Sequence, residues 1–285
     1  MDKLADGYLK AKAITKKHAK TFYFASLFLP KEKRLAAYAV YAICRISDDS
    51  IDNNPEAAAR ANLPKIKDRI STAYGNGELQ ENILLVFRET VRKYGIPKSY
   101  FDELIEGIEL DLNKKRYKSF EELYDYCYKV AGVVGLMMLK IFGYDDLNAE
   151  SYAVNLGIAM QLTNISRDIK EDYLRGRIYL PEGELKEFGV SEKDLADSKL
   201  SEGFKELLKL QIKRARDYYS NSKLGTRLIN DEKCRFVVYA MNEIYSGILD
   251  AIEKNGYDVF SRRAHVNGLG KLIRAAKLLT KGGHG

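Results

Sequence analysis

Residues 38–52 read Tyr-Ala-Val-Tyr-Ala-Ile-Cys-Arg-Ile-Ser-Asp-Asp-Ser-Ile-Asp, an apolar run that ends in a cluster of acids. Residues three or four apart meet on one face of a helix, so a shared face is predicted for Tyr41, Arg45, Asp48 or Asp49, and Asp52. The apolar residues before them indicate that much of this helix is buried. Buried carboxylates without partners become neutral or destabilise a fold. The stretch therefore predicts a helix whose acids hold cations, with an exposed acidic face as the alternative.

A second acidic cluster follows another apolar helical stretch, residues 152–160. Its polar side chains again recur every three or four residues: Gln161, Asn164, Arg167 or Asp168, and Asp172. Magnesium is usually held by one or two carboxylates together with the phosphates of a substrate. Two facing helices of this kind predict an assembly of two or three magnesium ions with a diphosphate, and the chemistry is the departure of that diphosphate.

The rest of the chain also follows the helical period. Its 285 residues are 46% hydrophobic and 31% charged, an ordinary globular composition that can bury a large core. We find no alternating strand pattern and no linker rich in Gly, Ser and Pro. Residues 181–201 are the most irregular part and are expected to form a surface excursion between two long helices. The sequence thus predicts a single all-α domain over residues 1–285.

The formal charge of +7 is unevenly distributed, because no acid follows Asp258 while several Lys and Arg residues do. A basic C-terminal segment suits nucleic acid, an anionic membrane surface or the polyphosphate of a substrate. A solvated helix face is the simpler alternative. The amphipathic residues 269–279, which include Leu269 and Leu279, suit either a bilayer surface or a helix that faces the core.

The three cysteines, Cys44, Cys127 and Cys234, form no CxxC pair and lie in apolar helical stretches. They are predicted to be small core residues in a reducing compartment. The N-terminal residues lack the apolar region of a signal peptide, and the longest apolar run, residues 35–44, is too short to span a bilayer. We therefore expect a cytoplasmic protein, with peripheral contact at a membrane left open.

Five blocks of the sequence resemble the squalene/phytoene synthase family, in the order and at the spacing of that family. The blocks are residues 18–22, 41–52, 126–135, which contains a VAGxVG motif, 161–181 and 256–263. The resemblance implies the all-helical isoprenoid-synthase fold, with a central cavity in the helical bundle. It also implies the head-to-head condensation of two allylic prenyl diphosphates. No nucleic-acid partner is expected of such an enzyme.

The resemblance also assigns the site residues. Magnesium is expected at Asp48, Asp52, Asn164, Asp168 and Asp172. The substrates are expected to contact His18, Lys20, Thr21, Phe22, Tyr41, Arg45, Gln161, Arg167, Tyr245 and Arg263. The expected catalytic residues are Tyr41, Arg45, Tyr128, Asp48, Asp52, Asp168 and Asp172. Asp49 and Glu171 are left without an assigned role.

In the scheme that the resemblance implies, the first diphosphate ionises and the allylic cation attacks the double bond of the second substrate. Loss of a proton gives a cyclopropylcarbinyl diphosphate, and a second ionisation rearranges it to the 1,1′-linked product. The cations stabilise the leaving group, and a dry, aromatic cavity protects the carbocation. Tyr41, Tyr128 and Tyr245 are candidates to steer the cation or relay its proton, with core packing as the alternative for each. Tyr128 is the most favoured of the three, because it lies in a matching motif. Gly132 and Gly135 serve close helix packing, room for the isoprenoid tail, or both.

The length of the tail separates members that use farnesyl diphosphate from those that use geranylgeranyl diphosphate. Ser26 is small where a bulky residue would block the end of a tail tunnel, which favours geranylgeranyl diphosphate and phytoene. Phe24, Phe28 and Tyr38 are equally able to close the cavity. Farnesyl diphosphate, giving dehydrosqualene or squalene, therefore stays open, and squalene alone would need NADPH.

Two rival functions remain. A terpene cyclase or chain-elongating prenyltransferase also has paired acidic helices, but the VAGxVG block and Arg45 argue against it. A basic helical module that binds a membrane or nucleic acid is the non-enzymatic alternative.

Overall fold

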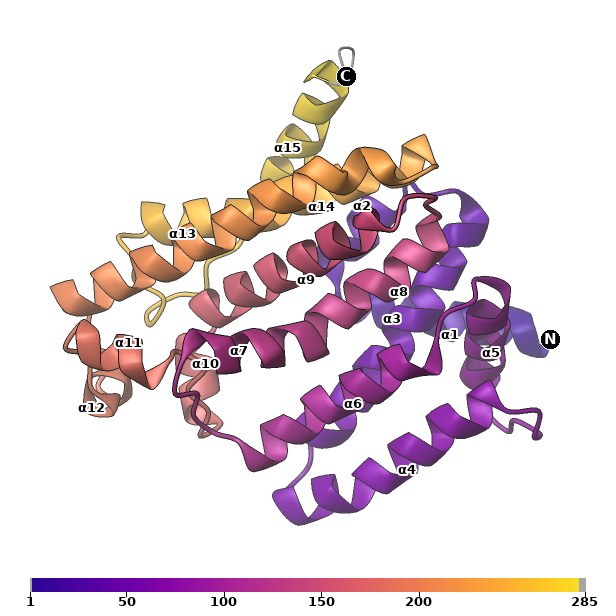
Figure 1. Cartoon of the computed structure of the whole chain (residues 1–285), viewed down its shortest axis with the longest axis horizontal. Helices are drawn as coiled ribbons and strands as arrows, with labels where there is room; N and C mark the ends of the chain where they lie inside the picture. Colours follow the sequence, from indigo (N-terminus) through magenta and orange to yellow (C-terminus); the bar gives the residue numbers. More distant parts are fainter. Residues whose placement is uncertain (1, 282–285) are drawn as a thin grey trace.

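The computed structural model describes residues 2–281 as an all-helical single domain (Figure 1), which confirms the predicted fold class. Met1 and residues 282–285 of the predicted 1–285 domain lie outside the described residues. Within the described part, β-type pairing is confined to one isolated bridge between Tyr144 and Ile229.

The α-helices are α1 (Lys3–His18), α2 (Lys20–Ser26), α3 (Lys31–Asp52), α4 (Glu56–Tyr74), α5 (Asn82–Lys93), α6 (Lys98–Asn113), α7 (Phe120–Cys127), α8 (Val133–Phe142), α9 (Asn148–Arg167), α10 (Ile169–Leu174), α11 (Glu182–Glu187), α12 (Glu192–Ala196), α13 (Glu202–Gly225), α14 (Glu232–Lys254) and α15 (Gly268–Lys281). A π-helical turn, η1 (Tyr128–Gly132), joins α7 to α8, and a 3₁₀ turn, η2 (Thr226–Leu228), follows α13.

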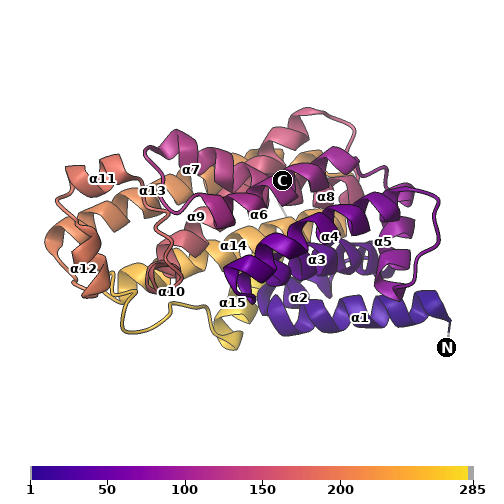
Figure 2. The same ribbon diagram turned by 90° about the horizontal axis from the view of Figure 1, so that it is seen from below.

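The two acidic clusters lie at the C-terminal ends of α3 and α9. The helix α3 contacts α1, α4 and α5, and its buried residues are mostly small, among them Ala36, Ala37, Ala39 and Ala42. Small side chains allow neighbouring helix backbones to approach closely. The helix α9 packs along α13, α8 and α14, as the ribbon shows in Figures 1 and 2. The helix that carries the first cluster and the helix that leads into the second are therefore held by neighbours along their length.

Glycine residues bring α9 close to the segment that contains η1 and α8. A Cβ atom on Gly157 would lie 2.3 Å from the carbonyl oxygen of Ala131, and one on Gly135 would lie 2.4 Å from that of Ala153. Both distances are far below van der Waals contact, so only glycine fits at these crossings. This confirms the packing role considered for Gly135 from the sequence, and Gly135 also lines the cavity described below.

The π-helical turn interrupts what the sequence presents as a single helix over the VAGxVG block. Its five residues, Tyr128–Gly132, separate α7 from α8. Such turns occur mostly as single insertions inside α-helices, frequently at functional sites. The turn changes the direction in which α7 and α8 present their side chains relative to one continuous helix.

The expectation for residues 181–201 is wrong in one respect, because this stretch contains the short helices α11 and α12. Leu185 and Leu195 are buried in a second part of the core. The sequence signal missed was the capping box at Ser191, whose hydroxyl accepts from the backbone of Asp194 while the Asp194 carboxylate accepts in return.

The helix α15 is amphipathic, as predicted, and packs against α14. Ala275 is buried, and Arg274 donates to Asp250 at 2.6 Å. Leu269 and Leu272 are 67% and 55% exposed, so this apolar row faces outward and not into the core. The side chain of Leu279 lies outside the described residues. No helix in residues 2–281 combines the length and apolar character needed to cross a membrane.

The cysteines are unpaired thiols, as expected. Cys127 and Cys234 are buried core residues, which confirms the prediction for these two. Cys44 is partly exposed and lines the cavity. Burial raises the pKa of the Cys44 thiol well above its usual range, and the nearby Asp48 adds to this shift.

Candidate active site

A cavity of about 370 Å³ lies between α3 and α9. Its apolar wall is formed mainly by α8, the first half of α9, and α14: Val134, Met138, Leu139, Phe142, Ala153, Leu156, Val237, Val238 and Met241. Its polar residues come largely from the C-terminal halves of α3 and α9 and from the end of α1: His18, Tyr41, Arg45, Asp48, Gln161 and Asn164. The cavity thus has an apolar interior and a polar end, and both acidic clusters contribute to that polar end.

The first cluster stands on the unbroken helix α3, as predicted. Arg45 donates to both oxygens of Asp49, at 3.0 Å from Nε and 2.5 Å from Nη2. Spacing alone assigned no role to Asp49. In the structure, the Asp49 carboxylate holds the guanidinium of Arg45, and Arg45 lines the cavity. Burial raises the pKa of Asp48 to about 7, and the charges of Asp52 and Asp111 add to the shift.

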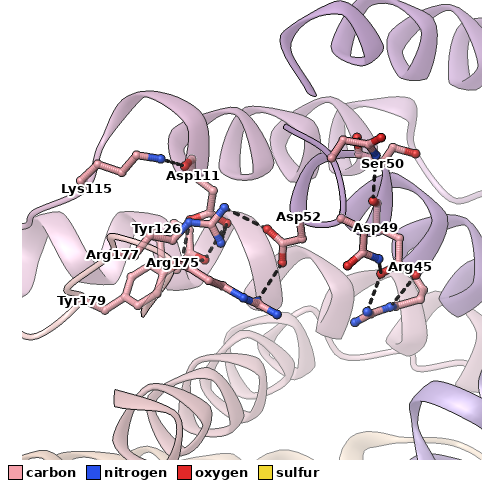
Figure 3. A network of polar contacts seen from close by, with 12 residues as sticks. Arg45, Asp49, Ser50, Asp52, Asp111, Lys115, Tyr126, Arg175, Arg177 and Tyr179 are labelled. Carbon is pink, nitrogen blue, oxygen red and sulfur yellow. Dashed lines mark hydrogen bonds and ion pairs between the residues drawn. The ribbon is translucent and has the colours of Figure 1, made fainter. Parts of the chain in front are cut away.

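Asp52 lies one turn further and faces two arginines from the chain after α10. Arg177 Nη2 donates to Asp52 Oδ1 at 2.9 Å, and Arg175 Nη1 lies 3.4 Å from Asp52 Oδ2. Figure 3 shows both guanidinium groups converging on this carboxylate. The end of the first cluster is therefore linked directly to the segment that follows the second cluster.

The second cluster does not form one continuous helical face, and this part of the prediction is wrong. The helix α9 ends at Arg167 and α10 begins at Ile169, with Asp168 at the junction (φ −105°, ψ 16°). Asp168 accepts from Arg167 at 2.8 and 2.5 Å and from Arg263 at 2.8 and 2.9 Å. Burial opposes ionisation of Asp168, but the hydrogen bonds from these two arginines outweigh it and lower the pKa.

Asp172 follows on α10 and resembles Asp48 in its surroundings. Burial raises the pKa of Asp172 to about 8, and the neighbouring charge of Asp168 adds to the shift. Within residues 2–281, no Lys or Arg forms a salt bridge with Asp48 or with Asp172. Each cluster therefore presents one partly buried carboxylate that forms no salt bridge with a described Lys or Arg.

This arrangement fits magnesium bound together with a diphosphate. Within the described residues, no three His, Cys, Asp or Glu side chains are grouped closely enough to hold an ion by themselves. The donors are carboxylate and amide oxygens, which suit a hard cation, and Asp48 and Asn164 both line the polar end of the cavity. Magnesium commonly uses only one or two protein carboxylates and completes its shell with water and substrate phosphate. A divalent cation would also offset the repulsion from neighbouring acids that adds to the effect of burial on both pKa values.

Most of the predicted site residues lie at the cavity or beside it. The cavity lining includes His18, Phe22, Tyr41, Arg45, Asp48, Gln161, Asn164 and Tyr245. Outside the lining are Lys20, Thr21, Asp52, Arg167, Asp168, Asp172 and Arg263. Of these, Lys20 is the exposed first residue of α2, two residues from Phe22, and its charge lies near Lys271 of α15. Burial and the charge of Lys20 lower the pKa of Lys271, a residue to which the sequence assigned no role.

The tyrosine favoured from the sequence is not placed at the cavity. Tyr128 begins η1, lies near Gly132 and has its hydroxyl directed at Glu103. It is not part of the cavity lining. Because a catalytic side chain must reach the reacting atoms, this placement argues against the predicted role of Tyr128.

The chain-length argument from Ser26 is wrong. Ser26 is fully buried, and its hydroxyl donates to the carbonyl of Tyr23 at 2.7 Å and pairs with the Tyr38 hydroxyl at 2.8 Å. Neither Ser26 nor Tyr38, Phe24 or Phe28 belongs to the cavity lining. Of α2, the residue that lines this cavity is Phe22, so the position of Ser26 gives no support for the longer tail.

A polar network behind Asp52 was missed. Its members are Asp111, Tyr126, Arg177 and Tyr179, all of them buried (Figure 3). Tyr126 opens the VAGxVG block, and Arg177 and Tyr179 fall in the last residues of the 161–181 block, so the motifs contained these residues without indicating their roles. Asp111, on α6, carried no motif signal.

Comparison with known proteins agrees with this geometry. The chain is 39% identical over 277 residues to a 15-cis-phytoene synthase from Synechococcus elongatus, covering 92% of this chain and 89% of the relative. It is 37% identical to the 15-cis-phytoene synthase from Synechocystis, covering 94% and 83% of the two chains. Each relative aligns over nearly the whole chain, so the similarity includes both clusters and the cavity.

Solved structures share the fold. A dehydrosqualene synthase crystal structure superposes with a TM-score of 0.91 at 29% identity, covering 98% of this chain and 97% of that one. A squalene synthase from Alicyclobacillus acidocaldarius gives 0.82 at 28% identity, with 90% and 96% covered. Residues 15–269 match the family model described as squalene/phytoene synthase. The chain therefore belongs to the squalene/phytoene synthase family, the prenyltransferases that join two prenyl units head to head.

Proposed function

We propose that this enzyme condenses two molecules of geranylgeranyl diphosphate to phytoene and releases two diphosphates, using magnesium at the polar end of the cavity. The observation that carries the proposal is the joint placement of Asp48 from α3 and Asn164 from α9 at one end of an otherwise apolar cavity. Acidic and amide oxygens at that end suit a metal-bound diphosphate, and the apolar interior suits an isoprenoid tail.

Magnesium, when bound, would neutralise charge on the departing diphosphate and so lower the barrier to ionisation. Asp48 and Asp172 are proposed as its main protein ligands, with Asn164, Asp52 and Asp168 contributing oxygens beside them. Arg45 would bind diphosphate oxygens, since Asp49 holds its guanidinium in place at the cavity. Planar guanidinium groups bind such oxygens in pairs.

A second group of cations surrounds this end of the site. Arg167 and Arg263 converge on Asp168, and Lys20 lies beside Lys271. We propose that these four side chains bind the diphosphates, with His18, Thr21 and Gln161 beside them. Preorganised positive charge is most effective where negative charge develops on a leaving group.

The cavity wall would protect the carbocations. Tyr41, Tyr245 and Phe22 line it, and the ring centroids of Phe22 and Tyr41 lie 5.8 Å apart. Aromatic faces attract cations without reacting with them as water would. Burial raises the pKa of both tyrosines above the usual range, which keeps their hydroxyls neutral. The first allylic cation would attack the second substrate here and lose a proton to give the cyclopropylcarbinyl diphosphate. A second ionisation would release the other diphosphate, and rearrangement of the resulting cation with loss of a second proton would give the 1,1′-linked product.

The choice of the longer substrate is supported by the relatives. Chains named phytoene synthase match at 37–39% identity over most of this sequence. The structures named dehydrosqualene and squalene synthase match at 29% and 28%. The alternative product from farnesyl diphosphate is favoured only by these more distant structural neighbours.

The test is a product analysis of the purified enzyme with each diphosphate, with and without NADPH, in the presence of magnesium. We expect phytoene from geranylgeranyl diphosphate, no requirement for NADPH, and two diphosphates released for each product molecule. Exclusive use of farnesyl diphosphate would overturn the proposed substrate. A requirement for NADPH, with squalene as the product, would show that the reaction is reductive and would contradict the proposed product.

A further inference from the structure

The turn after α10 connects the two acidic clusters. The backbone N–H groups of Arg175 and Arg177 donate to the carbonyl oxygen of Asp172, at 3.0 and 2.9 Å. Gly176 between them has φ +76°, a conformation that glycine adopts without strain. The turn is thus fixed by its backbone to the last acid of the second cluster.

The side chain of Arg177 extends from this turn to the first cluster. It is only 10% exposed, and its Nη2 donates to Asp52 Oδ1 at 2.9 Å. Arg175, from the same turn, is 53% exposed and lies at the longer distance of 3.4 Å from Asp52 Oδ2. A single residue, Arg177, therefore holds the second cluster by its backbone and the first by its side chain.

The other side of the Arg177 guanidinium faces Asp111 of α6. Asp111 Oδ2 lies 3.8 Å from Arg177 Nη1. Asp111 also accepts from the hydroxyls of Tyr179, at 2.7 Å, and Tyr126, at 3.1 Å. The rings of these two tyrosines are stacked with centroids 4.9 Å apart. Asp111 is therefore fixed in place by donors on two other segments, and its charge in turn fixes the guanidinium (Figure 3).

Arg177 is placed to support Asp52 and not to touch the substrate. It does not belong to the cavity lining, whereas Arg45 does. Its contact with Oδ1 leaves Asp52 Oδ2 facing the exposed and more weakly held Arg175, which can turn away into solvent. Carboxylates that bind metals are commonly oriented by a hydrogen bond from a neighbouring residue.

We infer that Arg177 is a positioning residue that sets the separation and orientation of the two acidic clusters, and that Asp111 acts through it. Arg177 keeps Oδ1 of Asp52 fixed so that Oδ2 is presented for a cation together with the second cluster. This inference rests on the proposed function, because it assumes that the clusters bind magnesium with a diphosphate. Through Arg177, Asp111 on α6 is linked to Asp52 on α3 and to the backbone of Asp172 on α10.

The experiment compares Arg177→Gln and Arg177→Lys with Arg175→Gln as the matched control. Both arginines lie in the same turn and face the same carboxylate, but only Arg177 is buried and faces Asp111. The first readout is the magnesium concentration that gives half-maximal turnover. The second is calorimetric binding of inorganic diphosphate in the presence of magnesium, which needs no catalysis. Thermal unfolding of each variant reports on the fold.

For Arg177→Gln we expect the half-maximal magnesium concentration to rise by about tenfold or more, as removal of residues that orient metal ligands commonly does. Diphosphate binding should weaken by a similar factor. Arg177→Lys keeps the charge but loses the planar fork, so both readouts should lie between those of the wild type and Arg177→Gln. It replaces Arg177→Gln in the comparison if the glutamine variant does not fold. Arg175→Gln should change both readouts by less than about threefold.

Asp111→Asn tests the proposed anchor. If Asp111 acts through Arg177, the double variant Asp111→Asn/Arg177→Gln should need no more magnesium than Arg177→Gln alone, since coupled residues are not additive. Equal magnesium requirements in the wild type and both Arg177 variants, with only the melting temperature lowered, would overturn the inference in favour of a structural ion pair. Independent, additive effects of the two substitutions would overturn the role of Asp111.

The inference and the proposed function fail in different ways. A wild-type enzyme that turns over no prenyl diphosphate would contradict the proposed function, whatever the variants do. A wild-type enzyme that is active and binds diphosphate with magnesium, beside an Arg177→Gln variant that matches it in both readouts, would contradict the inference alone.

Discussion

The two acidic clusters present their carboxylates on different backbones. In the first cluster, Asp48, Asp49 and Asp52 share the unbroken helix α3. In the second, α9 ends at Arg167, and Asp172 belongs to a separate short helix. Yet each cluster contains one partly buried acid with a raised pKa and at least one acid held by arginine. The same electrostatic arrangement is therefore built once by helical periodicity and once by a helix break.

The difference shows what each cluster depends on. The first combines a local pair, in which Asp49 orients Arg45 from within the same helix, with a distant one, because Arg177 donates to Asp52 across 125 positions of sequence. The second needs a partner from far along the chain, since Arg263 donates to Asp168 across 95 positions of sequence. Both clusters thus depend on an arginine that is distant in sequence, and the second depends in addition on the break between α9 and α10.

The largest expected effect comes from the two acids without cationic partners. Asp48→Asn and Asp172→Asn should each reduce magnesium-dependent turnover by about 100-fold or more, because each removes an oxygen charge placed for the metal. Diphosphate release at saturating substrate measures this, and circular dichroism should show an intact helical fold. Near-normal turnover in either variant would contradict the view that both clusters take part in the same way.

Substitution of an arginine-held acid should reduce activity less in the first cluster than in the second. Asp49→Asn loses one local pair, so we expect a rise in KM of about tenfold or less. Asp168→Asn removes the shared partner of Arg167 and Arg263 and alters the helix junction, so we expect a loss of about 100-fold in kcat/KM. Steady-state kinetics on both proteins provides the comparison. Equal effects would indicate that the helix break has no consequence for catalysis.

The packing of α9 should matter for the second cluster. Gly157→Ala places a methyl group 2.3 Å from the Ala131 carbonyl oxygen, and overpacking of this kind costs about 1–3 kcal/mol of unfolding free energy. Gly183→Ala in α11 is the control, because its nearest neighbour would be 3.4 Å away. Thermal or urea unfolding measures both. A Gly157→Ala protein as stable as the control would contradict the close approach of α9 to η1.

The smallest effect is a dependence of stability on pH. The folded pKa values of Asp48 and Asp172, about 7 and about 8, lie above the unfolded value of about 3.9. The folded state therefore binds more protons, and the stability from these groups is complete below about pH 4 and is lost as pH rises through 7 to 8. Without magnesium the melting temperature should fall by a few degrees between pH 5 and 8.5.

The control for this pH effect is the double variant Asp48→Asn/Asp172→Asn, which should show a flatter profile. Addition of magnesium and inorganic diphosphate to the wild type should also flatten it, because a cation offsets the charge repulsion. An identical slope in the wild type and the double variant would contradict the assignment of the pH dependence to these two acids.

Periodicity and motif order predicted the helical fold and most of the polar residues at the polar end of the cavity. The apolar run on α3 placed Tyr41, Arg45 and Asp48 correctly, because an uninterrupted helix preserves the spacing of its residues. The same logic failed at Asp168, since a break between two helices leaves no trace in a polar stretch of regular spacing.

The remaining errors also have physical causes. The π-helical turn at residues 128–132 shifts the direction of side chains, so helical spacing could not place Tyr128. Ser26 is buried against Tyr38, a contact between two helices that a single sequence does not reveal. Asp111 lies outside every matched block, and its role depends on a tertiary contact with Arg177.

The central claim is that acids from both clusters act together on the diphosphates of two prenyl substrates. The most direct measurement is product formation from geranylgeranyl diphosphate by the purified wild type, Asp48→Asn and Asp172→Asn enzymes as magnesium is varied. The account predicts magnesium-dependent phytoene formation by the wild type and its near-complete loss in both variants. Phytoene formation that persists in either variant, or that needs no magnesium, would contradict it.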